Sequence, residues 1–195
     1  MTREQEIVAA AAKVFMEKGY HHATIDDIAK TVGMLKGSLY YHIRSKQELL
    51  YKVLMEPSNA ATTRLREVRE AKLPALEKVR QAIHALIDHY DSNYPHMFVF
   101  LGEKLDQIPE EMRAQTAKDQ RNYDKLWREI IEEGVASGEL RQDLDPKMIA
   151  FAILGMCGWM HRWYDKAGRF SADEIAEMFS SMILRGIAEP NTEFR

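Results

Sequence analysis

Two tyrosines and a histidine occupy positions 40–42, and Lys36 and Lys46 stand on either side of them. Ser38 adds a hydroxyl group, and Gly37 leaves the backbone uncovered beside it. Tyrosine rings, hydroxyls and cations are the groups with which proteins contact the phosphates and base edges of duplex DNA. A glycine lets the backbone approach such a ligand closely. We therefore interpret this segment as a binding surface for nucleic acid.

The charge of the chain supports an anionic partner at this place. The chain carries a formal net charge of −3, with 27 Lys and Arg against 30 Asp and Glu. Between Lys30 and Lys52, in contrast, five cations stand against one anion, Glu48. A basic patch on an acidic protein suits an anionic partner that binds at one end. An ordinary solvated surface can have the same composition, so charge alone leaves both interpretations open.

The sequence contains no motif typical of an enzyme active site. It has no nucleophile elbow, no glycine-rich phosphate loop and no carboxylate pair beside a base. The single cysteine, Cys157, excludes a cysteine-rich zinc site. His84 and Asp88 share a helical face, but surface histidines are far commoner than metal ligands. We predict no enzymatic activity, no cofactor and no metal site.

The hydrophobic pattern predicts helices along the whole chain. Apolar residues recur at helical spacing from Ile7–Phe15 in the first helix to Ile175–Ile187 in the last. No alternating strand pattern and no internal repeat occurs. The longest uncharged apolar run, residues 148–160, is shorter than the roughly 18 residues that span a membrane. We predict an all-α protein of the cytoplasm with no membrane partner.

Two short helices and a glycine turn position the tyrosine segment. Thr24 is placed to cap a helix that ends near Val32. Gly33 follows this helix, and we expect it to form a sharp turn, because glycine readily adopts the positive φ that such a turn between helices requires. A second short helix is predicted over residues 36–43. This arrangement is typical of a helix-turn-helix, whose second helix enters the major groove.

Residues 9–54 resemble the N-terminal domain of TetR-family transcriptional regulators, and EKGYHHATIDDIAKTVGMLKGSLYYHIRSK carries most of the resemblance. Two positions depart from the family pattern. Ile43 stands where an aromatic residue is usual, and Leu35 where a small polar residue is frequent. The resemblance implies DNA-facing roles for Thr24, Lys36, Ser38, Tyr40, Tyr41, His42 and Lys46.

The resemblance also implies two domains, a DNA-binding domain of residues 1–47 and a helical effector-binding and dimerisation domain of residues 48–195. The last two helices carry more apolar surface than one core needs, which predicts a homodimer built on them. A monomeric core is the alternative. The residues predicted at the dimer interface are Phe151, Leu154, Gly155, Gly158, Ile175, Phe179, Met182 and Ile183.

Methionines and aromatic residues of the second domain could line an apolar effector pocket. Residues 158–179 resemble the tail of TetR-family regulators of fatty-acid and sterol-side-chain breakdown, which respond to acyl-CoA thioesters. Arg162 could meet the anionic head of such a ligand, or form a salt bridge instead. Methionine and aromatic residues at helical spacing more often belong to the core, which is the alternative for each of the others. The predicted effector-binding residues are Met97, Phe98, Leu101, Tyr123, Trp127, Met156, Trp159, Met160, Arg162 and Trp163.

The resulting hypothesis is a homodimeric repressor that binds a palindromic operator in double-stranded DNA and is released by a hydrophobic, acyl-CoA-type effector. A neutral, drug-like aromatic molecule is the second choice of effector. The alternative function is an architectural DNA-binding protein of the same fold that has no small-molecule effector.

Overall fold

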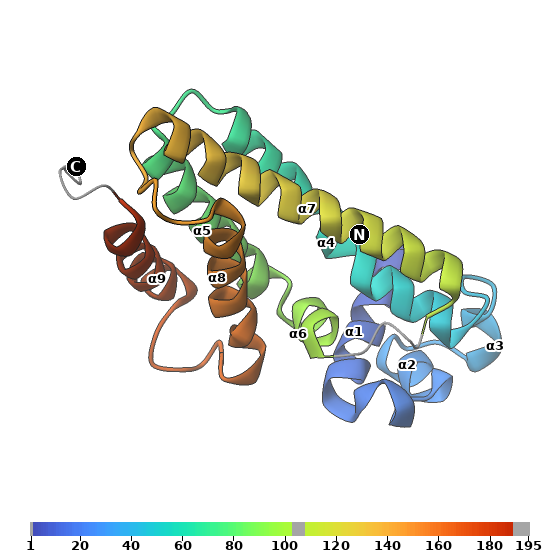
Figure 1. The fold of residues 1–195 in the computed structure, drawn as a ribbon. Helices are drawn as coiled ribbons and strands as arrows, with labels where there is room; N and C mark the ends of the chain where they lie inside the picture. The colour runs from blue at the N-terminus through green and yellow to red at the C-terminus, as the bar shows by residue number, and fades with distance from the viewer. Residues whose placement is uncertain (1, 103–107, 189–195) are drawn as a thin grey trace. The chain divides into compact units, whose positions relative to one another are not determined.

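Helices make up nearly all of the ordered structure. The computed structural model describes residues 2–102 and 108–188. In chain order its helices are α1 (Arg3–His22), α2 (Ile25–Thr31), α3 (Lys36–Leu39), α4 (Lys46–Glu70), α5 (Ala75–Ser92), α6 (Tyr94–Gly102), α7 (Glu110–Ser137), α8 (Pro146–Gly158), the 3-10 helix η2 (Trp159–Arg162) and α9 (Ala172–Ile187) (Figure 1). These elements confirm the prediction of an all-α protein. Across the described ranges, no helix is both long and apolar enough to cross a membrane.

Local sequence signals account for where several helices begin. Thr24 caps α2 in a reciprocal capping box with Asp27, and Ser171 caps α9 in the same way with Glu174. Gly33 adopts a φ of +70°, which closes the turn between α2 and α3 as predicted. The predictions at Thr24 and Gly33 are confirmed, because caps and turns depend only on neighbouring residues.

Helix α3 is shorter than predicted. It ends at Leu39 rather than near Ile43. The amide of Tyr41 donates to the Ser38 carbonyl and that of His42 to the Leu39 carbonyl, at 3.3 and 2.9 Å, so the chain tightens into turns after one helical turn. Ile43 is 2% exposed, and these turns bring it into the core. The aliphatic residue therefore fills the interior position that the family resemblance gives to an aromatic.

The described residues form two compact units. Unit 1 takes the chain up to Asn59 together with Asn93–Asp119, and unit 2 takes Ala60–Ser92 and the chain from Gln120 onward. Helices α4 and α7 contribute residues to both units. The boundary predicted between residues 47 and 48 lies in the first turn of α4.

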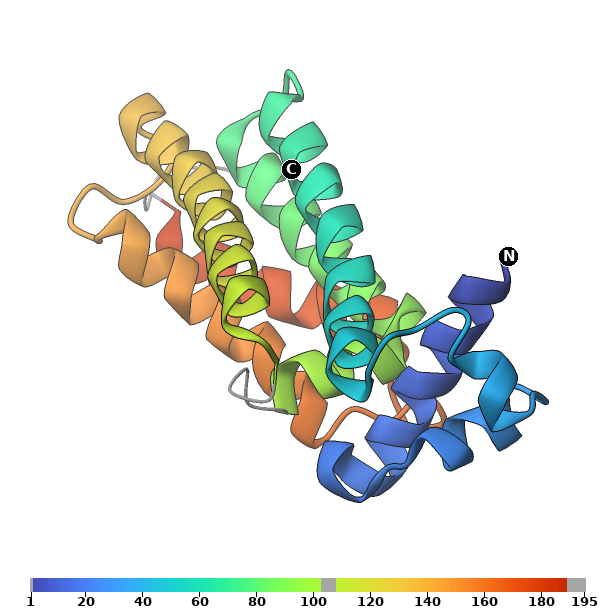
Figure 2. The ribbon, with the colours of Figure 1, turned by 90° about the vertical axis from the view of Figure 1, so that its right-hand side faces the viewer.

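Unit 1 is built on one hydrophobic core beneath the helix-turn-helix. Phe15 of α1, Ile28 of α2, Leu39 of α3 and Leu50 of α4 are each 0–1% exposed and belong to one cluster. Val99 of α6 closes the same core. Helices α1, α2 and α3, drawn in blue, gather beside the N-terminal part of α4 (Figure 2). The helix-turn-helix is thus held by buried side chains from every neighbouring helix.

Unit 2 is organised around α5. Its buried stripe includes Ile83, Ile87 and Tyr90, and the helix packs against both α8 and α9 (Figure 1). Trp127 of α7 is 0% exposed, and Ile153 of α8 is equally buried. The hydrophobic core of this unit therefore forms where the apolar residues of the amphipathic α5 pack against α8 and α9.

An ion pair between a buried lysine and a glutamate whose side chain is 47% exposed fastens α5 to α7. Lys78 is only 4% exposed, and its Nζ lies 2.7 and 2.8 Å from the two carboxylate oxygens of Glu133. The same ammonium group donates to the Arg69 carbonyl at 2.9 Å. Among the described residues, the polar partners of this buried cation come from within unit 2.

We expect Lys78→Met to lower the free energy of unfolding by about 1–3 kcal/mol, because Glu133 and a backbone carbonyl lose their donor while the apolar stem remains. Urea denaturation at fixed protein concentration measures this. Lys125→Met is the matched control, since its pair with Glu129 spans 3.5 Å and the Lys125 side chain is 62% exposed. Equal effects of the two substitutions would contradict a special role for Lys78.

Candidate nucleic-acid interface and ligand site

Helix α2, which leads into the Gly33 turn before α3, is held firmly at its N-terminal end. The hydroxyl of Thr24 accepts a hydrogen bond from the Asp27 amide at 3.1 Å, and the Asp27 carboxylate accepts one from the Thr24 amide at 3.0 Å. Lys18 of α1 lies 2.6 Å from the same carboxylate. Hydrogen bonds from Lys18 and then Thr24 hold the pKa of Asp27 well below its usual range. α2 is thereby held against α1 and presents α3.

The residues that follow this turn project an unusual amount of aromatic surface. Tyr41 is 90% exposed, Tyr40 50% and Leu35 80%. Lys36 and Gly37 are also exposed, whereas Ser38 is half-buried. Large apolar side chains gathered on a monomer surface mark a binding site. We refer to these exposed residues, together with Thr24, His42 and Ser38, as the recognition surface.

Acidic residues reduce the positive charge that the sequence window indicated. Lys36 pairs with Asp26 at 2.9 Å, and Lys52 pairs with Glu4 at 2.6 Å and with Glu48 at 3.2 Å. Asp26 and Glu4 lie outside the window of residues 30–52, so a count along the chain missed them. The positive patch near α3 is therefore weaker than the sequence suggested.

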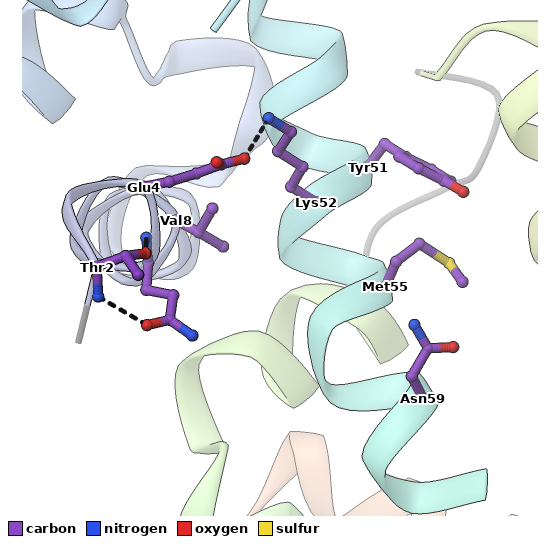
Figure 3. Close-up of a pocket in the computed structure, with 8 residues that line it drawn as sticks. Thr2, Glu4, Val8, Tyr51, Lys52, Met55 and Asn59 are labelled. Carbon is purple, nitrogen blue, oxygen red and sulfur yellow. Dashed lines mark hydrogen bonds and ion pairs between the residues drawn. The ribbon is translucent and has the colours of Figure 1, made fainter. Parts of the chain in front are cut away.

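The Lys52 pair ties α4 to the first turn of α1. Figure 3 shows the Lys52 side chain reaching Glu4. A cavity of about 380 Å³ lies beside this pair. Its lining residues are Thr2, Glu4, Gln5, Val8, Tyr51, Lys52, Met55 and Asn59.

Lys46 differs from the other predicted DNA-facing residues. Its Nζ lies 4.3 Å from the centre of the Tyr20 ring and 3.4 Å from the His21 carbonyl oxygen. The side chain is half-buried by these contacts with α1. Substitution of Lys46 would therefore disturb packing inside unit 1 as well as any phosphate contact, which makes Tyr40 and Tyr41 cleaner probes of the recognition surface.

We expect Gly37→Ala to lower the affinity for duplex DNA about three- to tenfold, because a methyl group would separate α3 from a closely approaching sugar-phosphate backbone. The free protein has room for it, since no atom lies within 4 Å of the added carbon and the φ of Gly37 is not positive. The melting temperature should be unchanged or slightly raised. Electrophoretic mobility shift and thermal melts measure the two effects, and a loss of stability would contradict this interpretation.

In unit 2, α7 and α8 bring together part of the predicted effector site. Burial raises the pKa of Tyr123 to about 12, and burial likewise raises the pKa of the Cys157 thiol to about 12. The indole of Trp127 lies beside the Tyr123 hydroxyl and partly opposes the effect on Tyr123. Within the described part of the chain, the buried Nε1 of Trp127 has no acceptor in good hydrogen-bonding geometry. Met160 is also fully buried, while Met156 is half-buried.

The other predicted effector residues are not gathered at this place. Met97 and Phe98 belong to unit 1, and the side chain of Leu101 lies outside the described residues. Trp159, Arg162 and Trp163 are exposed at the end of α8, with the Arg162 guanidinium 5.6 Å from the Trp159 ring.

Exposed apolar residues on α8 and α9 form a continuous face. Met148 and Phe151 of α8 and Met182 of α9 are exposed. Met148 and Met182 also line a groove of about 360 Å³, whose lining residues are Leu144, Asp145, Met148, Ile149, Ala152, Ile153, Met182, Ile183, Gly186 and Ile187. We call this surface the α8–α9 face.

The residues predicted at a dimer interface occupy different depths in unit 2. Gly155 is exposed like Phe151 and Met182, whereas Leu154, Gly158, Phe179 and Ile183 are half-buried. Ile175 is 2% exposed and packs inside its own unit, so it supports the face from beneath. Met148 was missed by the sequence prediction, although it lies three residues before Phe151 and so falls on the same side of a helix.

His84 faces acidic residues of α9 rather than Asp88, which is exposed. Its Nε2 lies 3.4 Å from Glu177 and its Nδ1 3.7 Å from Asp173. Within residues 2–102 and 108–188, no group of three His, Cys, Asp or Glu side chains is arranged to hold a metal ion.

Comparison with known proteins identifies one family model in the N-terminal part of the chain and another in the C-terminal part. The family model described as "Bacterial regulatory proteins, tetR family" matches residues 7–53, and "Tetracyclin repressor-like, C-terminal domain" matches residues 72–187. The chain belongs to the TetR family. Members of the TetR family are DNA-binding transcriptional regulators and not enzymes, which confirms both predictions from the sequence.

Individual TetR-family relatives are similar over most of the chain. The HTH-type transcriptional repressor KstR2 of Mycolicibacterium smegmatis is 29% identical over 96% of this chain and 92% of its own. The fatty acid metabolism regulator protein of Bacillus subtilis is 28% identical over 77% of each chain. The crystal structure of AibR in complex with isovaleryl coenzyme A and operator DNA has a TM-score of 0.83 at 24% identity, covering 93% of this chain and 97% of its own. This last likeness establishes the fold.

Proposed function

We propose that the protein is a homodimeric repressor that binds a palindromic operator through α3 and leaves it when a hydrophobic, acyl-CoA-type effector binds unit 2. The observation that carries the proposal is the recognition surface, where two tyrosines project beside Lys36 from a tightly packed helix-turn-helix. Exposed rings and donors in this position suit contacts to thymine methyl groups, base edges and phosphates.

The α8–α9 face supports the dimer. A monomer would leave Met148, Phe151 and Met182 in water, and pairing α8 and α9 with their copies would bury them. A two-fold dimer presents two α3 helices, which suits an operator with two half-sites about one helical turn apart.

The effector class is supported by the buried cluster of Tyr123, Trp127 and Cys157 and by the relatives. A buried indole donor without an acceptor in good geometry, beside the Tyr123 hydroxyl, suits a ligand that is mostly hydrocarbon with a polar carbonyl group. A relative is named for fatty acid metabolism, and AibR holds an acyl-CoA on the same fold.

We expect a matching acyl-CoA to raise the melting temperature and to lower operator affinity at least about tenfold, because a ligand shifts the equilibrium by its preference for one state. The operator is first selected from a pool of random duplexes. Acyl-CoAs of increasing chain length are then compared with free coenzyme A and free fatty acids in thermal-shift and fluorescence anisotropy assays.

Trp127→Phe is the test variant, because it keeps an aromatic ring and removes the indole donor; it also reduces the buried volume, so thermal melts verify that the variant remains folded. It should weaken effector binding several-fold and leave operator binding intact. Operator binding that no acyl-CoA or aromatic compound changes would favour the architectural alternative. Failure to select any duplex would overturn the proposed function.

A further inference from the structure

An ion pair joins the two helices of the helix-turn-helix on the recognition surface. Lys36 opens α3, and its Nζ lies 2.9 Å from a carboxylate oxygen of Asp26 in the first turn of α2. Both side chains are about half exposed, at 53% and 51%. The hydrogen bond to Asp26 is the main reason that the pKa of Lys36 is raised. The cation best placed to meet DNA is therefore already bound to an anion of the protein.

The carboxylate of Asp26 has a smaller structural task than that of its neighbour, since it lies in the first turn of α2 and there faces the positive end of the helix dipole. Asp27 caps α2 through Thr24 and pairs with Lys18. Asp26 makes no capping bond, and among the described residues its recorded hydrogen-bond partner is Lys36. An exposed ion pair of this kind contributes little to stability. We therefore expect the Asp26–Lys36 pair to affect DNA binding rather than stability.

A carboxylate and a phosphate compete for the same ammonium group. Lys36 must leave Asp26 before it can pair with a DNA phosphate, and the abandoned carboxylate then faces the negative charge of the duplex. Binding to arbitrary sequences depends almost wholly on phosphate contacts, whereas an operator also offers base contacts. The competition therefore acts most strongly against DNA of the wrong sequence.

We propose that the Asp26 carboxylate occupies Lys36 in place of a DNA phosphate. By holding Lys36, Asp26 lowers the affinity of the protein for DNA of arbitrary sequence. The inference rests on the proposed function, because it concerns the same surface of the same DNA-binding protein. It assigns to Asp26 a role in specificity that depends on Lys36.

The test measures binding of a labelled duplex of mixed random sequence by fluorescence anisotropy across a salt series. Asp26→Asn should raise the affinity about three- to tenfold for a dimer, since one pair is removed from each protomer. It should also steepen the dependence of log K on log salt by about 2, because each Lys36 gains a phosphate. In a Lys36→Gln background the same substitution should raise the affinity much less, because only the repulsion between the Asp26 carboxylate and the duplex is then removed.

Glu17→Gln is the control for the loss of one charge, because Glu17 is an exposed partner of Lys13 on α1 at 4.0 Å. It should change the affinity much less than Asp26→Asn does. Thermal melts verify that all variants remain folded.

An unchanged or reduced affinity of Asp26→Asn would overturn the inference, and so would an increase of the same size in the Lys36→Gln background. If the wild-type protein binds its selected operator while Asp26→Asn behaves like wild type, only this inference fails. If the wild-type protein binds no duplex at all, the proposed function fails and the inference fails with it.

Discussion

Met182→Glu should convert the protein from a dimer into a folded monomer and lower operator affinity by about a hundredfold or more, because a monomer engages one half-site without the second. Met182 is 67% exposed on α9, so the substitution does not disturb the core of unit 2. In a symmetric dimer it buries two unpaired carboxylates in an apolar interface. Each burial costs several kcal/mol, which a dimer of moderate stability cannot offset.

Light scattering coupled to size-exclusion chromatography measures the change in mass, with one chain at 22.6 kDa. Circular dichroism verifies that the monomer keeps its helices. Ala136→Glu on α7 adds the same side chain at another exposed helical position and should leave the dimer intact. A Met182→Glu variant that remains dimeric would show that the α8–α9 face is not the dimer interface.

The double substitution Tyr40→Ala and Tyr41→Ala should reduce operator affinity by roughly two orders of magnitude. A ring that contacts a thymine methyl group or lies along a sugar-phosphate strand contributes about 1–3 kcal/mol, and a dimer carries two copies of each tyrosine. The variant should melt close to the wild-type protein, because Tyr41 is 90% exposed and Tyr40 is half exposed in the free protein.

The corresponding phenylalanine variants distinguish the contribution of the rings to operator affinity from that of their hydroxyl groups. Tyr41→Phe removes one donor and should cost only a few-fold in affinity if the ring supplies most of the contact. Affinity is measured by anisotropy on the selected operator and on random duplex. Operator binding of wild-type strength by the double alanine variant would rule out α3 as the element that reads DNA.

Local features of this protein were predictable from its sequence. The caps at Thr24 and Ser171 and the positive φ of Gly33 follow from residues within a few positions of each other. The period of apolar residues predicted which faces are buried, as Ile28 and Leu39 illustrate. Helix propensity, capping and periodicity are short-range properties, so a single chain is enough to read them.

The charges at the recognition surface depended on tertiary structure. The count of residues 30–52 indicated a strong basic patch, but Asp26 reaches Lys36, Glu4 reaches Lys52, and Lys46 lies on the Tyr20 ring. Each partner is 10 to 48 residues away in the chain. These contacts arise from the angles at which helices cross, and no periodic pattern encodes those angles.

Depth within unit 2 was likewise decided by packing. Ile175 and Met182 both belong to the apolar stripe of α9, yet one is 2% exposed and the other 67%. Trp127 is buried and Trp159 is exposed, although both were predicted to line one pocket. The sequence determined that these helices are amphipathic. Which apolar residues remain available to a partner or a ligand was decided by the helices that cover each face, because burial is a property of the assembled helices.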